Sequence, residues 1–229
     1  MATAPPRADR AHAHGFTLVE LLVALMVMAL LSLMSWRGLD AMGRAQSQTQ
    51  ARADDLMALQ SGLAQWSADL DAMANELGNS VNNPALPSPL DWNGLVLRIT
   101  RYSSGAGEPG LRVVAWSSGT DRGRKVWLRW QSPVLRTRTA LQDAWLQAAV
   151  WGQSPNEDSR AHQVSITPLT EWDLFYYRGG AWSNPGSSSD TTNATPEGVR
   201  LLLTLPEGQP LVGTISRDWM RPNVVATKS

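Results

Sequence analysis

Apolar side chains fill the chain almost without interruption between residues 16 and 36. Up to residue 34 the only polar residues in this run are Thr17, Glu20 and Ser32, and only Glu20 is ionisable. Since a helix rises about 1.5 Å per residue, the run is about 31 Å long as a helix, and a hydrocarbon core is about 30 Å thick. A helix also bonds all of its backbone groups internally, as a membrane requires. Residues 16–36 are therefore predicted to cross a membrane as one helix.

The pattern then changes to that of an amphipathic helix over residues 37–77. Apolar residues recur at spacings of three and four positions, which places them on one face: Leu56, Leu59, Leu63, Trp66, Leu70, Met73 and Leu77. We expect this helix packing face to lie on the chain's own β-sheet, with pairing to another helix in a coiled coil as the alternative. Gly38 and Gly43 are either tolerated on an exposed face or mark a point where the helix can unwind. Gly78 and the prolines that follow it end the helix.

The rest of the chain, residues 78–229, has the pattern of a β-rich globular domain. Short runs rich in apolar, β-branched and aromatic residues are predicted as strands: 95–100, 111–116, 126–130, 164–166, 172–177, 199–205 and 211–216. Residues 206–210 form the turn of a hairpin, residues 139–151 a short helix, and the Ser- and Thr-rich stretch 183–195 a loop. The predicted fold class is α+β, with a long N-terminal helix packed on antiparallel β-sheet.

A short polar leader carrying Arg7 and Arg10 precedes the apolar run and ends at Gly15. A secretory signal is normally cut after an apolar core of about 7–15 residues, behind a pair of small residues spaced as A-x-A. Here the run is longer, and the residues after it, SWRGLDAMGRA, contain no such pair in the first few positions. The sequence is therefore predicted to keep its apolar segment and to lose residues 1–15.

The residues at this junction, Gly15-Phe16-Thr17-Leu18-Val19-Glu20, resemble the processing site of type IV prepilins and type II secretion pseudopilins. The match is specific because a glycine, an aromatic residue and a glutamate four residues later coincide with the start of an apolar helix. The resemblance implies that a prepilin peptidase cuts after Gly15 and methylates the new amino terminus at Phe16.

Glu20 is the one carboxylate inside the predicted span. A carboxylate in a spanning helix costs about 2–3 kcal/mol, and the positive helix end favours an acid in the first turn by about 0.3–1 kcal/mol. The helix end explains how Glu20 is tolerated but not why it is present. The resemblance implies that Glu20 pairs with the amino group of a neighbouring Phe16 in a filament, which makes it an assembly residue.

Charge and composition narrow the function. The chain has 20 basic and 20 acidic residues, so no broad electrostatic field favours nucleic acid. It has no cysteine, and of its 3 histidines only His162 lies outside the leader, which leaves little for a metal centre or a histidine-based relay. Asp69 and Asp71 are two apart on a helix and point in different directions, so they make a poor pair of catalytic acids. We expect no catalytic residues, no metal, no cofactor and no enzyme activity.

Two further features have structural explanations. Residues 105–110, GAGEPG, match a dinucleotide-binding motif literally, but they lead into a strand-like run rather than a helix, so a hairpin loop is predicted. Most of the 11 tryptophans are expected to be core or half-buried residues, and Trp36 is expected to anchor the end of the span at the membrane interface.

Several segments beyond the leader resemble the J-type minor pseudopilins of type II secretion: WRGLDA at 36–41, LAQWSADL at 63–70, LRW at 128–130, VLR at 134–136, FYY at 175–177 and PEGVRL at 196–201. The resemblance implies a structural subunit in the tip, or initiation, complex of a short periplasmic filament that supports export across the outer membrane. Its implied partners are I-type and K-type minor pseudopilins, the major pseudopilin, the prepilin peptidase and the inner-membrane assembly platform. It also implies a single pass through the inner membrane, with the C-terminal domain in the periplasm.

Two alternatives stay open. A minor pilin of a type IV pilus would share the leader and differ mainly in its globular domain. A membrane-anchored periplasmic enzyme or binding protein would use the apolar segment only as an anchor and would keep its leader.

Overall fold

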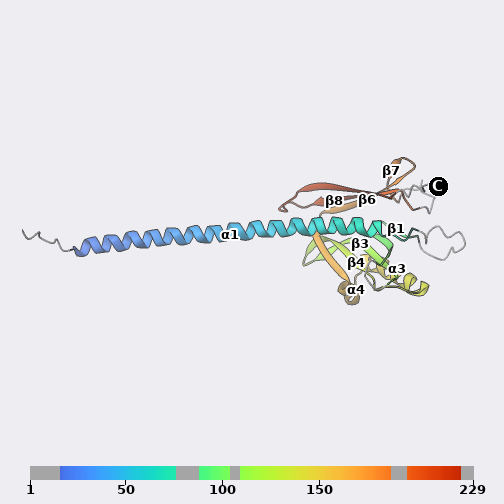
Figure 1. The fold of residues 1–229 in the computed structure, drawn as a ribbon, viewed down its shortest axis with the longest axis horizontal. Helices are drawn as coiled ribbons and strands as arrows, with labels where there is room; N and C mark the ends of the chain where they lie inside the picture. The colour runs from blue at the N-terminus through green and yellow to red at the C-terminus, as the bar shows by residue number, and fades with distance from the viewer. Residues whose placement is uncertain (1–15, 76–87, 104–108, 187–194, 223–229) are drawn as a thin grey trace, which may run out of the picture. The chain divides into compact units, whose positions relative to one another are not determined.

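The computed structural model describes residues 16–75, 88–103, 109–186 and 195–222 (Figure 1). The chain divides into two compact units, residues 1–51 and residues 52–229. The first helix, α1 (Leu18–Asp71), begins in the first unit and ends in the second.

In the first unit, the described residues are almost entirely helical, and the helix is long and apolar enough to cross a membrane. No residue in the most apolar stretch of this helix is buried, and Trp36 is 72% exposed. Helix α1 continues through Gly38 and Gly43, and a side chain added at either glycine would meet nothing within 4 Å. Both glycines therefore lie on an open helix surface.

The second unit contains two antiparallel sheets, where the sequence predicted antiparallel sheet without dividing it. The first has the order β1-β2-β3-β4-β5 and consists of β1 (Leu90–Trp92), β2 (Val96–Tyr102), β3 (Leu111–Asp121), β4 (Arg124–Gln131) and β5 (Gln163–Pro168). The second has the order β7-β6-β8-β9 and consists of β6 (Glu171–Arg178), β7 (Ala181–Ser183), β8 (Gly198–Leu205) and β9 (Gly213–Met220). Two helices, α3 (Arg138–Gln153) and α4 (Glu157–Ala161), connect β4 to β5.

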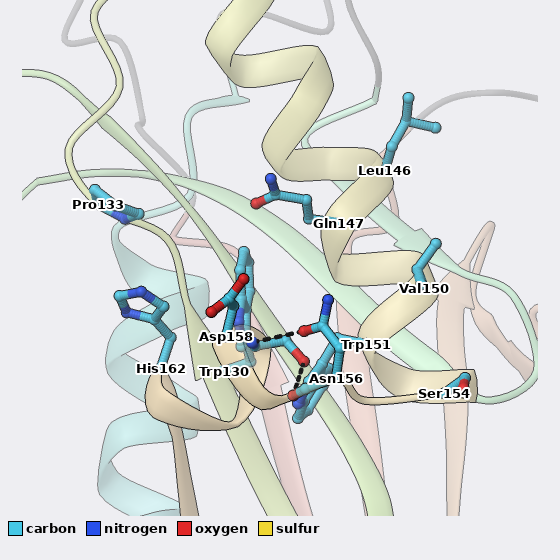
Figure 2. Close-up of a pocket in the computed structure, with 11 residues that line it drawn as sticks. Trp130, Pro133, Leu146, Gln147, Val150, Trp151, Ser154, Asn156, Asp158 and His162 are labelled. Atoms are coloured by element: carbon cyan, nitrogen blue, oxygen red, sulfur yellow. Dashed lines mark hydrogen bonds between the residues drawn. The ribbon is translucent and has the colours of Figure 1, made fainter.

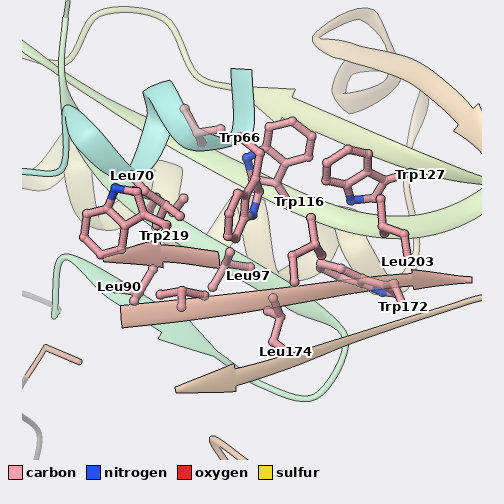
Figure 3. Packing of buried hydrophobic residues seen from close by; sticks show 14 of the residues in the cluster. Trp66, Leu70, Leu90, Leu97, Trp116, Trp127, Trp172, Leu174, Leu203 and Trp219 are labelled. Atoms are coloured by element: carbon pink, nitrogen blue, oxygen red, sulfur yellow. The ribbon is translucent and has the colours of Figure 1, made fainter. Parts of the chain in front are cut away.

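The main core forms where the end of α1 lies between the two sheets (Figure 3). Trp66 and Leu70 of α1 are fully buried in it, together with side chains from both sheets. From the first sheet come Leu97, Ile99, Val114, Trp116 and Trp127, and from the second Trp172, Leu174, Tyr176, Val199, Leu201, Leu203 and Trp219. Both sheets bury an apolar face on the same stretch of helix, which makes this stretch the centre of the unit.

A second core forms on the other face of the first sheet, where α3 packs. Residues of α3 spaced three and four apart are buried there: Leu141, Ala144, Trp145, Ala148 and Trp151. The Thr137 side chain caps the helix by accepting a hydrogen bond from the Ala140 backbone N–H. Since both faces of the first sheet are covered, β2 buries Val96 on one side and Leu97 on the other.

The predicted fold class is confirmed, and every predicted strand and the helix at 139–151 are present. The short elements β1, β7 and α4 were not predicted. Most tryptophans are buried, as expected: Trp66, Trp116, Trp127, Trp130, Trp145, Trp151, Trp172 and Trp219. Residues 104–108 of the GAGEPG segment lie outside the described residues, and the strands on either side of it, β2 and β3, pair as antiparallel neighbours.

The predicted end of the long helix is wrong by several residues. Helix α1 ends at Asp71, not near Leu77, because the next backbone groups bond to β2 instead of to the helix. The Tyr102 N–H donates to the Ala72 carbonyl, the Ala74 N–H donates to the Thr100 carbonyl, and Met73 forms a β-bridge with Arg101. Leu77 and Gly78 lie outside the described residues.

Gly62 lets α1 pass close to β5. A Cβ added at Gly62 would lie 2.3 Å from Cγ2 of Ile166 and 3.3 Å from Cζ3 of Trp127. We expect Gly62→Ala to lower the free energy of unfolding by about 1–3 kcal/mol through overpacking, although alanine is the better helix former by about 1 kcal/mol. Denaturant titration of the full chain in non-ionic detergent measures the change.

Ile166→Ala provides the matching test, because it removes the Cγ2 atom that the new Cβ would meet. Introduced into an Ile166→Ala background, Gly62→Ala should cost markedly less than it does alone. An equal cost in both backgrounds would show that the close approach to Ile166 is not what requires a glycine.

Candidate functional site

The N-terminal end of α1 is the first candidate site. Phe16 is 87% exposed, and the helix begins two residues later. The Glu20 backbone N–H donates to Oγ1 of Thr17 at 3.3 Å, so Thr17 caps the helix and Glu20 lies in its first turn. A threonine followed three residues later by a glutamate is a common signature of a helix start.

The Glu20 side chain is exposed, and it forms no ion pair or hydrogen bond within the described residues. Its carboxylate projects from a helix whose neighbouring side chains, Leu21, Val19 and Val23, are apolar and exposed. In a bilayer such a carboxylate is stabilised by a cationic partner. The geometry therefore leaves Glu20 available to a positive group from another molecule.

The C-terminal end of α1 carries a second group of charged side chains around Asp69, which is fully buried. Its carboxylate accepts hydrogen bonds from Trp116 Nε1 at 3.0 Å, from Arg129 Nε at 2.8 Å and Nη2 at 2.9 Å, and from Arg101 Nη1. Gln65, one helical turn earlier, donates to the same carboxylate at 2.9 Å. These charge-assisted bonds join the helix to β2, β3 and β4 of the first sheet.

Asp71 joins the same helix end to the second sheet. Its carboxylate accepts a hydrogen bond from Trp219 Nε1 of β9 at 2.7 Å, and Arg217 Nε of the same strand donates to Oγ of Ser67 at 3.4 Å. Asp69 and Asp71 thus point to opposite sides, as their spacing predicted, and each bonds to one sheet. The arrangement fixes the end of the helix between the two sheets.

A hollow of about 450 Å³ lies between β4, α3 and α4 (Figure 2). Leu146 and Val150 project from α3 at its rim, and Trp130 and Trp151 lie in its wall with their ring centroids 6.4 Å apart. The Trp151 Nε1 donates to the side chain of Gln163. In the part of the chain that the structure describes, no three His, Asp or Glu side chains cluster as metal ligands would.

On the outer face of the second sheet, Arg200 donates two hydrogen bonds to Asp218, both at 2.7 Å. These bonds hold the pKa of the Asp218 carboxyl below its ordinary value and raise the pKa of Arg200. Arg200 also lies over the ring of Trp182, 4.2 Å from its centroid. A solvent-exposed pair of this kind contributes little to stability.

Comparison with known proteins agrees with the geometry of the N-terminal site. Residues 10–36 match the family model described as the prokaryotic N-terminal methylation motif. The chain is also 26% identical over 211 residues to type II secretion system protein J of Vibrio cholerae serotype O1 (strain ATCC 39315 / El Tor Inaba N16961), a match that covers 87% of this chain and 85% of the relative. The chain thus carries the N-terminal motif of the type IV prepilin and pseudopilin family and is similar to a type II secretion protein J along most of its length. Within that family it resembles the J-type pseudopilins, as the sequence segments predicted.

The predicted site residues of this pseudopilin-like chain lie in two places, at the exposed start of α1 and on its buried packing face. Phe16 and Glu20 lie at the exposed start of α1, and Gly15 lies outside the described residues. On the helix packing face, Leu59, Trp66, Leu70 and Met73 are buried in the main core, Leu63 packs against that core, and Leu56 is half-buried. The face packs on the chain's own sheets, and Leu77 lies outside the described residues.

Sequence reasoning missed Asp69 as a structural centre. It considered Asp69 only as one of a possible pair of catalytic acids, although the side chain is as buried as Trp66 and Leu70. One signal was available, since the LAQWSADL segment that resembles J-type pseudopilins ends in this aspartate and the leucine after it. The arginines that meet it, Arg101 and Arg129, lie far away in sequence and could not be paired with it by pattern.

Proposed function

We propose that this chain is a minor pseudopilin, a structural subunit of the tip or initiation complex of a type II secretion pseudopilus. The observation that carries the proposal is the coincidence of a G-F-T-L-V-E junction with an exposed apolar helix, in a chain similar to protein J along 87% of its length. In this role the chain supports protein export across the outer membrane and does so as a building block rather than an enzyme.

Processing at the leader follows from the same proposal. A prepilin peptidase removes residues 1–15 by cutting after Gly15, and it methylates the amino terminus of Phe16. Residues 16–36 then span the inner membrane, residues 37–71 extend the helix beyond it, and the residues that follow complete the domain in the periplasm. Support comes from the exposed apolar surface of α1, which a membrane or neighbouring helices would cover.

Glu20 and the globular domain would have separate roles in assembly. Glu20 pairs with the amino group of Phe16 of an adjacent subunit, which sets the register between helices in the filament. The domain contacts I-type and K-type minor pseudopilins laterally, and the major pseudopilin and the inner-membrane assembly platform add the rest of the filament. Support for the first role is that the Glu20 carboxylate has no partner among the described residues of its own chain.

The mass of the mature chain tests the processing step. Intact-mass analysis of protein extracted from membranes should show a chain that begins at Phe16 and carries one additional methyl group. A Gly15→Val variant should keep Met1 in the same cells, because the peptidase requires the glycine. A wild-type chain that still begins at Met1 would favour a simple membrane anchor instead.

Co-purification tests the proposed partners. The full chain in detergent should co-purify with I-type and K-type pseudopilins from the same cells. No association under conditions in which those two bind each other would count against the J-type role. A type IV pilus minor pilin has the same leader, and association with pilus subunits in place of the pseudopilins would identify that alternative.

A further inference from the structure

Arginines gather on the face of the first sheet that α1 covers, near the C-terminal end of that helix. Arg101 of β2 is paired directly with Arg112 of β3 across the two strands. On β4, Gln131 is paired with Val114, which follows Arg112 by two positions and therefore faces the same side. Arg129 precedes Gln131 by two positions, so it shares that face as well.

The hydrogen bonds of Arg112 and Arg129 leave several of their donors unused. Arg129 bonds to Asp69 and to Oε1 of Gln131, whereas Arg112 donates only through Nη1, to the Ser132 carbonyl. Within the described residues, no acceptor meets Nη1 of Arg129, Nε and Nη2 of Arg112, or Nε2 of Gln131. These atoms are not among the buried polar atoms that lack a partner, so none of them is fully buried.

A hollow of about 410 Å³ lies against these donors. Arg112, Arg129, Gln131 and His162 line it, and no carboxylate does among the described residues. Asp158 of α4 lines the separate hollow of Figure 2. We call the hollow lined by Arg112 and Arg129 the arginine hollow.

We propose that the arginine hollow binds a carboxylate group carried by an acidic segment of another polypeptide. Two guanidinium groups and an amide N–H supply donors on one side of a single space, and guanidinium groups match the two oxygens of a carboxylate. Arg112 has no carboxylate partner in the described part of the chain, so its charge is not balanced there. A bound carboxylate would balance the positive charge that this arrangement leaves at the surface.

The lining favours a polypeptide over a free small anion. Pro133 and Val164 also line the hollow, and Val164 is 59% exposed. An acidic side chain on a partner protein brings apolar neighbours that cover such a rim, whereas a free dicarboxylate leaves it in water. The proposal goes beyond the proposed function and is tested on the chain by itself, so its failure is separate from a failure of the pseudopilin role.

Calorimetric titration of the full chain in non-ionic detergent at low salt tests the binding. The probes are a blocked hexaglutamate peptide, a hexaglutamine peptide of the same length, and succinate. We expect the glutamate peptide to bind and the glutamine peptide not to bind. Arg112→Gln should weaken binding of the glutamate peptide at least about tenfold, since a charge-assisted pair is lost.

Arg138→Gln is the matched control, because it removes the same charge from an exposed position on α3 outside the hollow. It should leave the affinity within about twofold of the wild type. Gln131→Glu is a second variant in the hollow: its carboxylate remains beside Arg129 and should weaken peptide binding as Arg112→Gln does. Near-UV circular dichroism of the Arg112→Gln and Gln131→Glu variants should match that of the wild type, because neither replacement removes a hydrogen bond to Asp69.

The outcomes are distinct. Equal weakening by Arg112→Gln and Arg138→Gln would overturn the site, because it would show only a general charge effect. If neither the glutamate peptide nor succinate binds, the proposed site is overturned as well. If succinate binds as tightly as the peptide and Arg112→Gln weakens both, the carboxylate site stands and the polypeptide source is overturned.

Discussion

Replacing Asp69 with alanine should lower the free energy of unfolding of the globular unit by about 3–5 kcal/mol. The substitution removes the carboxylate that both Arg101 and Arg129 contact while it leaves their guanidinium groups largely buried. Their side chains are 8% and 13% exposed, so water replaces the lost partner poorly. The Nε1 of Trp116 also loses its acceptor. For a unit of this size we expect the Tm to fall by about 6–20 °C.

Asp71→Ala is the matched control for Asp69→Ala. Asp71 is exposed and lies on the same helix end, and within the described residues it accepts a single hydrogen bond, from Trp219 Nε1. Its loss should cost about 1 kcal/mol. Thermal unfolding of the full chain in detergent, followed by near-UV circular dichroism of the tryptophans, measures both variants. Similar decreases in Tm for the two variants would mean that Asp69 is not the main attachment between the end of α1 and the sheets.

Glu20→Leu should abolish incorporation of the chain into a filament or tip complex while leaving it in the membrane. The replacement removes a carboxylate that costs about 2–3 kcal/mol in a span, so membrane insertion should be at least as favourable as before. In the proposed role, it also removes the partner of the Phe16 amino group. Membrane fractionation and cross-linking to the other pseudopilins in living cells measure the two effects separately.

Leu22→Glu and Glu20→Gln sharpen the test of Glu20. Glu20→Gln keeps the shape of the side chain and removes its charge, so it should lose assembly as Glu20→Leu does. The double variant Glu20→Leu with Leu22→Glu restores a carboxylate on another side of the helix and should not restore assembly. Normal assembly of Glu20→Leu would mean that the apolar segment is only an anchor.

Local patterns predicted most of the fold. The spacing of Leu59, Trp66 and Leu70 identified the face of α1 that is buried, and the apolar run at 199–205 predicted the strand β8, whose Val199, Leu201, Leu203 and Leu205 enter the core. Both signals are periodic and short in range, so they can be read before any tertiary contact is known. The start of α1 was equally clear, because the polar leader gives way there to the apolar run.

The parts that pattern could not supply depend on contacts between distant residues. Helix α1 ends at Asp71 because Met73 and its neighbours bond to β2, which lies about thirty positions later in the chain. Asp69 reads as a surface residue in sequence, and only the arrival of Arg101, Trp116 and Arg129 from three strands makes its burial favourable. The division of the strands into two sheets likewise follows from the helix lying between them.

The joint at the end of α1 has a mechanical consequence. Asp69 ties the last turns of the helix to one sheet, and Asp71 ties them to the other, so a tensile load that travels along the helix divides between two attachments. Neither sheet can peel away alone while its own attachment holds. A force applied along the helix would therefore displace both sheets together.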